Sequence, residues 1–137
     1  MAPQVLTDAV FIWDGEDHSD HLISVDGPFG REMLDDSAMS DTTRSNKAGA
    51  AVWSVTATFF SDEAASENMA DMYPALVAGT VATVELRPTS AARSATNPGY
   101  NGSGVIESMQ TVSGDYGAMQ TTQVVIRSAG DQTRSTS

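Results

Sequence analysis

Apolar and polar side chains alternate in several short segments of the chain, which is the pattern of β-strands with one buried face. The clearest alternation runs over residues 52–60, where every second residue is apolar. The apolar face of this segment consists of Trp53, Val55, Ala57 and Phe59. We expect that face to lie in the core, with the Ser and Thr residues between on the other face.

Five further segments have the composition of strands, being rich in β-branched or aromatic residues or alternating in polarity. They are residues 9–13, 21–25, 80–87, 105–112 and 118–128, and Met33-Leu34 adds a shorter piece. The last two are joined by the turn sequence Gly114-Asp115-Tyr116-Gly117, so the sequence predicts a C-terminal hairpin. The predicted fold class is therefore mainly β.

One helix is predicted, over residues 61–78. Ser61 is a good N-cap, and Asp and Glu follow it in the first turn, where the helix dipole favours acids. Apolar side chains then recur at helical spacing at Met69, Met72, Tyr73 and Leu76. Pro74 predicts that the regular helix stops or kinks near Tyr73.

Two consequences of this helix concern packing. The solvent side of the predicted helix carries Glu67, Asn68 and Asp71. The apolar side should face the strand at 52–60, so we expect contacts of Trp53, Val55 and Phe59 with Met69, Met72 and Leu76.

Three polar segments interrupt the predicted elements. Residues 35–49 indicate a long loop or the tip of a long hairpin, and loops of this length are often functional. A second loop is predicted at 89–103. Residues 130–137 contain no apolar side chain and are expected to form a flexible tail, so that residues 1–129 form a single domain.

The net charge of the chain is −11 and is unevenly distributed. Residues 1–41 contain ten acids and one base, residues 42–87 five acids and three bases, and residues 88–137 three of each. Such a chain is not expected to bind DNA through its phosphates. Like charge would instead let DNA pass without sticking.

Candidate chemistry is sparse. There is no cysteine, and no phosphate-binding or dinucleotide-binding glycine motif. His18 and His21 lie near several acids and could ligate a metal, but a solvated turn is the simpler interpretation. No nucleophile–base pair is evident, so we expect neither enzymatic activity nor a cofactor. No apolar run is long enough to cross a membrane.

The order of elements resembles that of the major tail protein, or tail-tube protein, of siphophages. The resemblance covers roughly residues 5–130. It is strongest from Trp53 onward, in Asn97-Pro98-Gly99-Tyr100-Asn101-Gly102 and in the turn Val112-Ser113-Gly114-Asp115-Tyr116-Gly117.

The resemblance implies a β-sandwich or β-barrel with one flanking α-helix. It also implies six-membered rings that stack through a long loop and the chain termini into a tube, with DNA leaving through an acidic channel. Further partners would be the tape measure, terminator and distal tail proteins, and the protein would be located in the virion, after assembly in the bacterial cytoplasm.

The resemblance also directs attention to charged residues. Acids in or near the predicted inner strands are candidates for the channel wall: Glu85, Glu107 and, less directly, Asp115. The long loop would provide the ring-stacking contact through Asp35, Asp36, Asp41, Arg44 and Lys47.

Two other classes of protein fit the same composition. Capsid decoration proteins and tail terminators or connectors are also small, acidic and β-rich. A carbohydrate-binding β-sandwich is a further alternative, but it would expose aromatic residues on one face, and aromatics make up only 7% of this chain.

Overall fold

The computed structural model describes residues 5–40, 42–65 and 67–136. These residues form nine strands, one α-helix and one short 3₁₀ helix. The strands are β1 (Val10–Trp13), β2 (Glu16–Asp17), β3 (Leu22–Asp26), β4 (Phe29–Asp35), β5 (Asn46–Phe60), β6 (Val81–Arg87), β7 (Gly99–Met109), β8 (Thr121–Ser128) and β9 (Thr133–Ser135). The helices are η1 (Ser19–His21) and α1 (Asn68–Ala78). The predicted mainly β fold with one flanking α-helix is confirmed.

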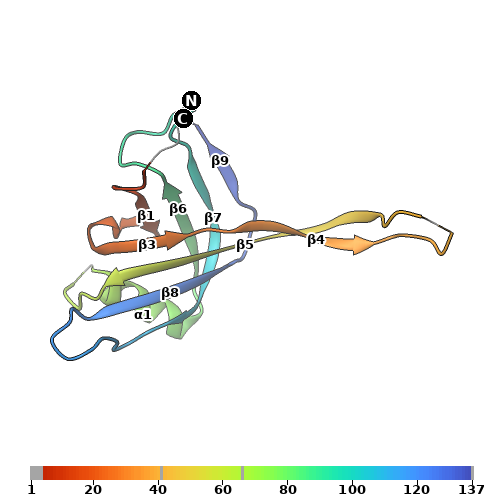
Figure 1. Ribbon diagram of the computed structural model, residues 1–137. Helices are drawn as coiled ribbons and strands as arrows, with labels where there is room; N and C mark the ends of the chain where they lie inside the picture. The colour runs from red at the N-terminus through yellow and green to blue at the C-terminus, as the bar shows by residue number, and fades with distance from the viewer. Residues whose placement is uncertain (1–4, 41, 66, 137) are drawn as a thin grey trace.

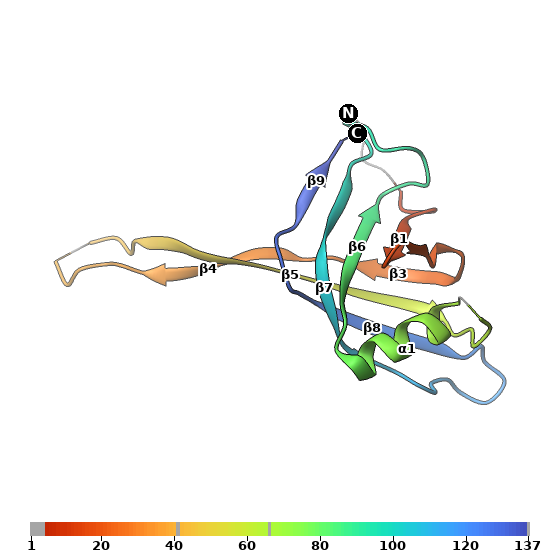
Figure 2. The same ribbon diagram turned by 180° about the vertical axis from the view of Figure 1, so that it is seen from behind.

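All strand pairs are antiparallel, and the sheet order is β2-β1-β6-β7-β8-β5-β3. The sheet folds over, so that β3, β5 and β8 run across the direction of β1, β6 and β7 (Figure 1). The predicted C-terminal hairpin is the β7–β8 pair. α1 lies beside the lower end of β6 and β7, seen from behind in Figure 2.

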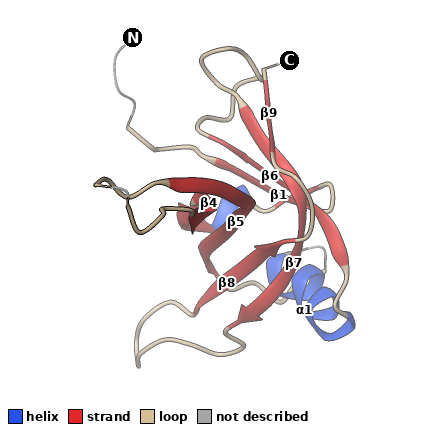
Figure 3. Ribbon diagram, turned by 90° about the vertical axis from the view of Figure 1, so that its right-hand side faces the viewer, coloured by secondary structure: helices blue, strands red, loops and turns tan. Residues whose placement is uncertain are grey.

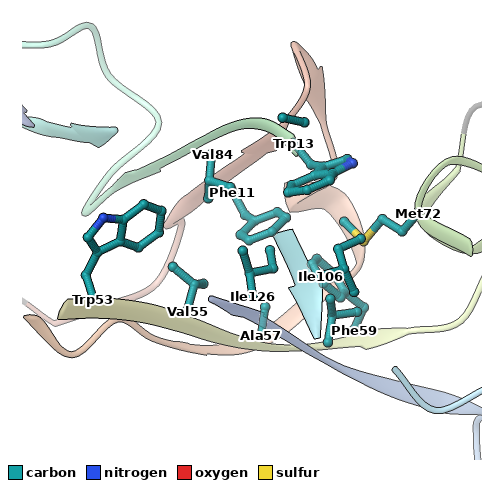
Figure 4. Close-up of a cluster of buried hydrophobic side chains, with 12 residues drawn as sticks. Phe11, Trp13, Trp53, Val55, Ala57, Phe59, Met72, Val84, Ile106 and Ile126 are labelled. Carbon is teal, nitrogen blue, oxygen red and sulfur yellow. The ribbon is translucent and has the colours of Figure 1, made fainter. Parts of the chain in front are cut away.

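The core lies inside this fold of the sheet (Figure 4). The predicted apolar face of β5 is confirmed, because Trp53, Val55, Ala57 and Phe59 are all buried. The ring of Phe59 meets that of Phe11 edge to face, with centroids 5.2 Å apart. Trp53 lies at the end of the core away from Met72, so the expectation that it packs on the helix is wrong.

The helix begins at Asn68, seven residues later than predicted, with Glu67 rather than Ser61 as N-cap. The cause is the side chain of Asn68, which was expected to face solvent but is buried. Its amide donates to the carbonyl oxygen of Phe60 and its oxygen accepts from the N–H of Asp62. These bonds tie the end of β5 and the segment after it to the start of α1, and they use backbone groups of Phe60 and Asp62 that a helix starting at Ser61 would need.

The helix also continues past Pro74, which lies on its exposed side, and ends at Gly79 in the left-handed conformation. Pro74 therefore did not stop it. Tyr73 is about half exposed (48%), whereas Met69 and Met72 are buried, so only part of the predicted apolar stripe reaches the core.

The remaining loops are shorter than predicted. β7 begins at Gly99, so the second loop covers 88–98, where the buried amide of Asn97 bonds to the backbone of Thr89 and Ala91. The expected flexible tail contains β9, which pairs with Gly99–Asn101 of β7. Among the described residues, none of the helices has the length and apolar character that a membrane crossing requires.

Candidate assembly surface

The most prominent feature of the molecule is a two-stranded extension, residues 29–52, which we call the arm; it is seen side-on in Figures 1 and 2 and points toward the viewer in Figure 3. β5 is 15 residues long, and only its inner half, from Ser54 onward, pairs with β8 and β3. Its outer half pairs with β4 and leaves the body (Figure 1).

The predicted long loop at 35–49 corresponds to the outer end of the arm. Asp35 is the last residue of β4, and residues 46–49 belong to β5, so the connection itself covers 36–45. Of the two interpretations of this segment, the tip of a long hairpin is the one observed. Asp41 lies outside the described residues.

The charged side chains near the tip largely pair with one another. Arg44 binds Asp35, and the Nζ of Lys47 lies 3.9 Å from the carboxylate of Asp36. The pKa of Asp35 is lowered, first by the backbone N–H of Ser37, then by the Ser37 hydroxyl and Arg44. The tip is therefore close to neutral and has its own internal bonds.

One face of the arm is apolar. Cross-strand partners lie on the same face, and the pairs Gly30–Val52 and Met33–Ala48 alternate with Ala50 along it. Met33 and Val52 are 62% and 47% exposed. Across the described residues, neither edge of the arm pairs with a further strand, so its backbone N–H and C=O groups are also open to a partner.

A second apolar area lies along α1. A groove of about 540 Å³ separates the helix from the segment after β7, and is lined by Met69, Tyr73, Pro74 and Val112 among others. Val77 and Val112 are largely exposed. The sequence signal for this surface is the apolar stripe of the helix, which helical spacing alone predicts to lie in the core.

The structure does not bring the three candidate channel acids together. Glu85 on β6 is only 12% exposed and lies between Arg87, at 2.8 Å, and Arg93. Glu107 on β7 pairs with Arg127 of β8, and Asp115 is exposed in the β7–β8 loop. Glu85 and Glu107 are thus neutralised locally, and their place in a channel wall stays a prediction.

The two histidines do not share a site. His18 is buried, and its Nε2 lies 2.8 Å from Asp71 of α1, so it is not part of a solvated turn. His21 lies 3.0 Å from Asp62 and 3.5 Å from Glu67. The donor atoms of Asp20, His21 and Glu67 lie within 4.8 Å of one another, a spacing that a metal ion could bridge.

These contacts have a clear structural consequence. His18, the residue before η1, is tied to α1, and His21 ties η1 to the segment before α1, although these parts are far apart in the sequence. The backbone N–H of Ala64, followed by His21, holds the pKa of Asp62 below its usual value.

No protein-family model and no curated protein matches the sequence. Solved structures do match the fold. A chain of the virion of a native gene transfer agent (GTA) particle is 14% identical, with 97% of this chain and 99% of that chain covered and a TM-score of 0.79. The SPP1 tail tube is 13% identical, with coverage of 98% and 80% and a TM-score of 0.79.

A third match is to the tail of an empty GTA particle with C6 symmetry, which is 16% identical, with coverage of 84% and 82% and a TM-score of 0.68. At these identities the likeness is one of fold. The chain therefore has the tail-tube fold, as the resemblance in its sequence implied.

Proposed function

We propose that this protein is the structural subunit of a phage-type tail tube, and that it assembles into rings which stack on one another. The observation that carries the proposal is a tail-tube fold with an arm whose apolar face its own body cannot cover. Exposed apolar surface of this kind is typical of an interaction site.

The arm is suited to contact a neighbouring ring. A strand rises about 3.3 Å per residue, so the seven residues of β4 alone span roughly 23 Å before the connection at 36–45 begins. Met33 lies on this extension and is 62% exposed, so a second molecule would be needed to cover it. The ion pairs of the tip lower the charge repulsion between the tip itself and a second acidic copy.

Within a ring, neighbouring subunits would join through open sheet edges. β3 and β2 end the sheet, and pairing such edges with another copy satisfies their backbone groups. Six subunits are proposed because one of the tails that this fold matches has C6 symmetry.

The tube would serve as a conduit for DNA rather than as a DNA-binding protein. The net charge of −11 disfavours phosphate contacts. We propose a location in the virion tail, with tape measure, terminator and distal tail proteins as further partners. The role is structural and not catalytic.

A shortened arm tests the proposal. Arg31 lies opposite Ala51, so residues 32–50 can be replaced by Asn-Gly, which closes a two-residue hairpin turn. We expect wild-type protein to form tubes in negative-stain electron microscopy, and the shortened protein to keep its thermal unfolding transition but form no stacks.

Two outcomes would contradict the proposal. Normal tubes from the shortened protein would remove the arm from stacking. Wild-type protein that binds preformed capsid shells but never forms tubes would instead indicate a decoration protein.

A further inference from the structure

The sheet divides at Trp53. On the body side of this residue, Ser54 lies opposite Arg127 of β8, and on the arm side Trp53 lies opposite Phe29 of β4. After β8 the chain stops pairing at 129–132 and then pairs with β7 again as β9. β5 therefore leaves with β4 as the arm, while β9 stays with β7 (Figure 1).

The side chain of Trp53 fills the point of division. It is 2% exposed, and its indole N–H donates to the carbonyl oxygen of Gly130 at 2.8 Å. Two glycines of β7 make room for the ring. A Cβ on Gly102 would lie 2.8 Å from Cζ2 of Trp53, and one on Gly104 would lie 3.3 Å from its Cη2.

The C-terminal segment that receives the indole is itself held in place. β9 pairs with β7, and the guanidinium of Arg93 donates to the Ser135 hydroxyl at 3.2 Å while pairing with Glu85. The arm has no comparable support, because a two-stranded ribbon is only marginally stable in water and this one pairs with no third strand among the described residues. Its direction must be fixed at its base.

We infer that Trp53 is a positioning residue of the arm, and that through it residues 129–135 set the direction in which the arm leaves the body. The C-terminal segment would thus influence ring stacking through the direction of the arm. That last consequence rests on the proposed tube function, whereas the effect on arm direction does not.

Distance measurement by pulsed EPR tests the inference on the soluble protein. The chain has no cysteine, so labels at Thr43→Cys on the arm and Thr80→Cys on the body report one distance. Both positions are exposed. Trp53→Phe removes the bond to Gly130, and Gly102→Ala pushes on both the indole and the Asp131 carbonyl, which lies 2.8 Å from the added Cβ.

Matched controls are available in the same chain. Trp13→Phe changes a buried indole at the other end of the core. Gly30→Ala adds a methyl group in the arm where nothing lies within 4 Å. We expect a broader distance distribution for Trp53→Phe, a shifted mean for Gly102→Ala, and wild-type distributions for both controls.

The inference is overturned if Trp53→Phe and Gly102→Ala, shown to be folded by circular dichroism, both keep the wild-type distribution. If either fails to fold, a chain ending at Ser128 decides: an unchanged arm distance overturns the inference and a changed one supports it. Tube formation is scored separately, so wild-type protein that forms no tubes would count against the proposed function and leave the distance result interpretable.

Discussion

Phe59 and Phe60 are neighbours at the end of β5 with opposite environments. Phe59 is fully buried against Phe11, whereas Phe60 is 39% exposed on the other face. We expect Phe59→Ala to lower the free energy of unfolding by about 3–5 kcal/mol, because it leaves a cavity in the core. Phe60→Ala, the matched control, should cost clearly less, and urea denaturation measures both. Equal losses would contradict the placement of β5.

The lowered pKa of Asp62, in the segment before α1, predicts that the free energy of unfolding depends on pH. Its pKa is lowered by the N–H of Ala64 and by His21, so the charged form is favoured by folding. At pH values above the pKa of the unfolded chain, about 3.8, the charged carboxylate adds to the stability of the folded state. That contribution is lost as the pH falls through the lower pKa of the folded state. Asp62→Asn should therefore be less stable than wild type at pH 6, and the difference should vanish toward pH 2.

Urea denaturation at several pH values measures this difference. Glu63→Gln is a suitable control, since it removes a neighbouring acid that does not contact His21 in the described residues. A difference between Asp62→Asn and wild type that stays constant from pH 6 to pH 2 would show that these bonds do not stabilise the folded state.

At the scale of elements, the arm gives the sharpest prediction. Met33→Asp places a charge on the apolar face of the arm, which should block stacking because a buried unpaired charge is costly. The monomer should stay as stable as wild type, since Met33 is already 62% exposed. Met119→Asp makes the same change at a residue 68% exposed in the β7–β8 loop, and should leave stacking intact. Electron microscopy compares tube lengths, and equal lengths for all three proteins would contradict the prediction.

The sequence predicted elements that carry a local signal. Alternation located the inner half of β5, and the turn at 114–117 located the β7–β8 hairpin. It did not predict β9, because Thr133-Arg134-Ser135 has no apolar face and forms a strand only by pairing with β7. The start of α1 was missed for a similar reason, since the buried amide of Asn68 bonds to the end of β5.

The candidate assembly surface was also predictable from the sequence only in part. Polar residues at 35–49 marked the arm tip, whereas the apolar face of the arm depends on a bulge between Arg31 and Met33 that sets the register. Local sequence does not specify such a register shift. Likewise, alternation places Glu85 and Arg87 on one face of β6, but the second partner, Arg93, reaches Glu85 from a loop and could not be predicted from that alternation.

At the scale of the whole molecule, the uneven charge constrains how a tube would treat DNA. Glu85 is an unsuitable residue for charge reversal, because a lysine there would face Arg87 and Arg93 and destabilise the sheet. Asp115 is exposed in a loop and can be reversed without breaking an ion pair found in the described residues. In the proposed six-membered ring that change would occur six times, which would make one residue a sensitive probe.

Asp115→Lys in assembled tubes tests whether residue 115 faces the channel or the outer surface of the tube. A lysine facing the channel should retain short linear duplex DNA, which can enter, but not closed circular DNA, which cannot. A lysine on the outer wall should bind both. The binding should weaken steeply with salt, because phosphate contacts release counterions. We expect the linear-only result if Asp115 lines the channel, with Asp115→Asn tubes binding neither form. Equal retention of linear and circular DNA by co-sedimentation would place Asp115 on the outer surface.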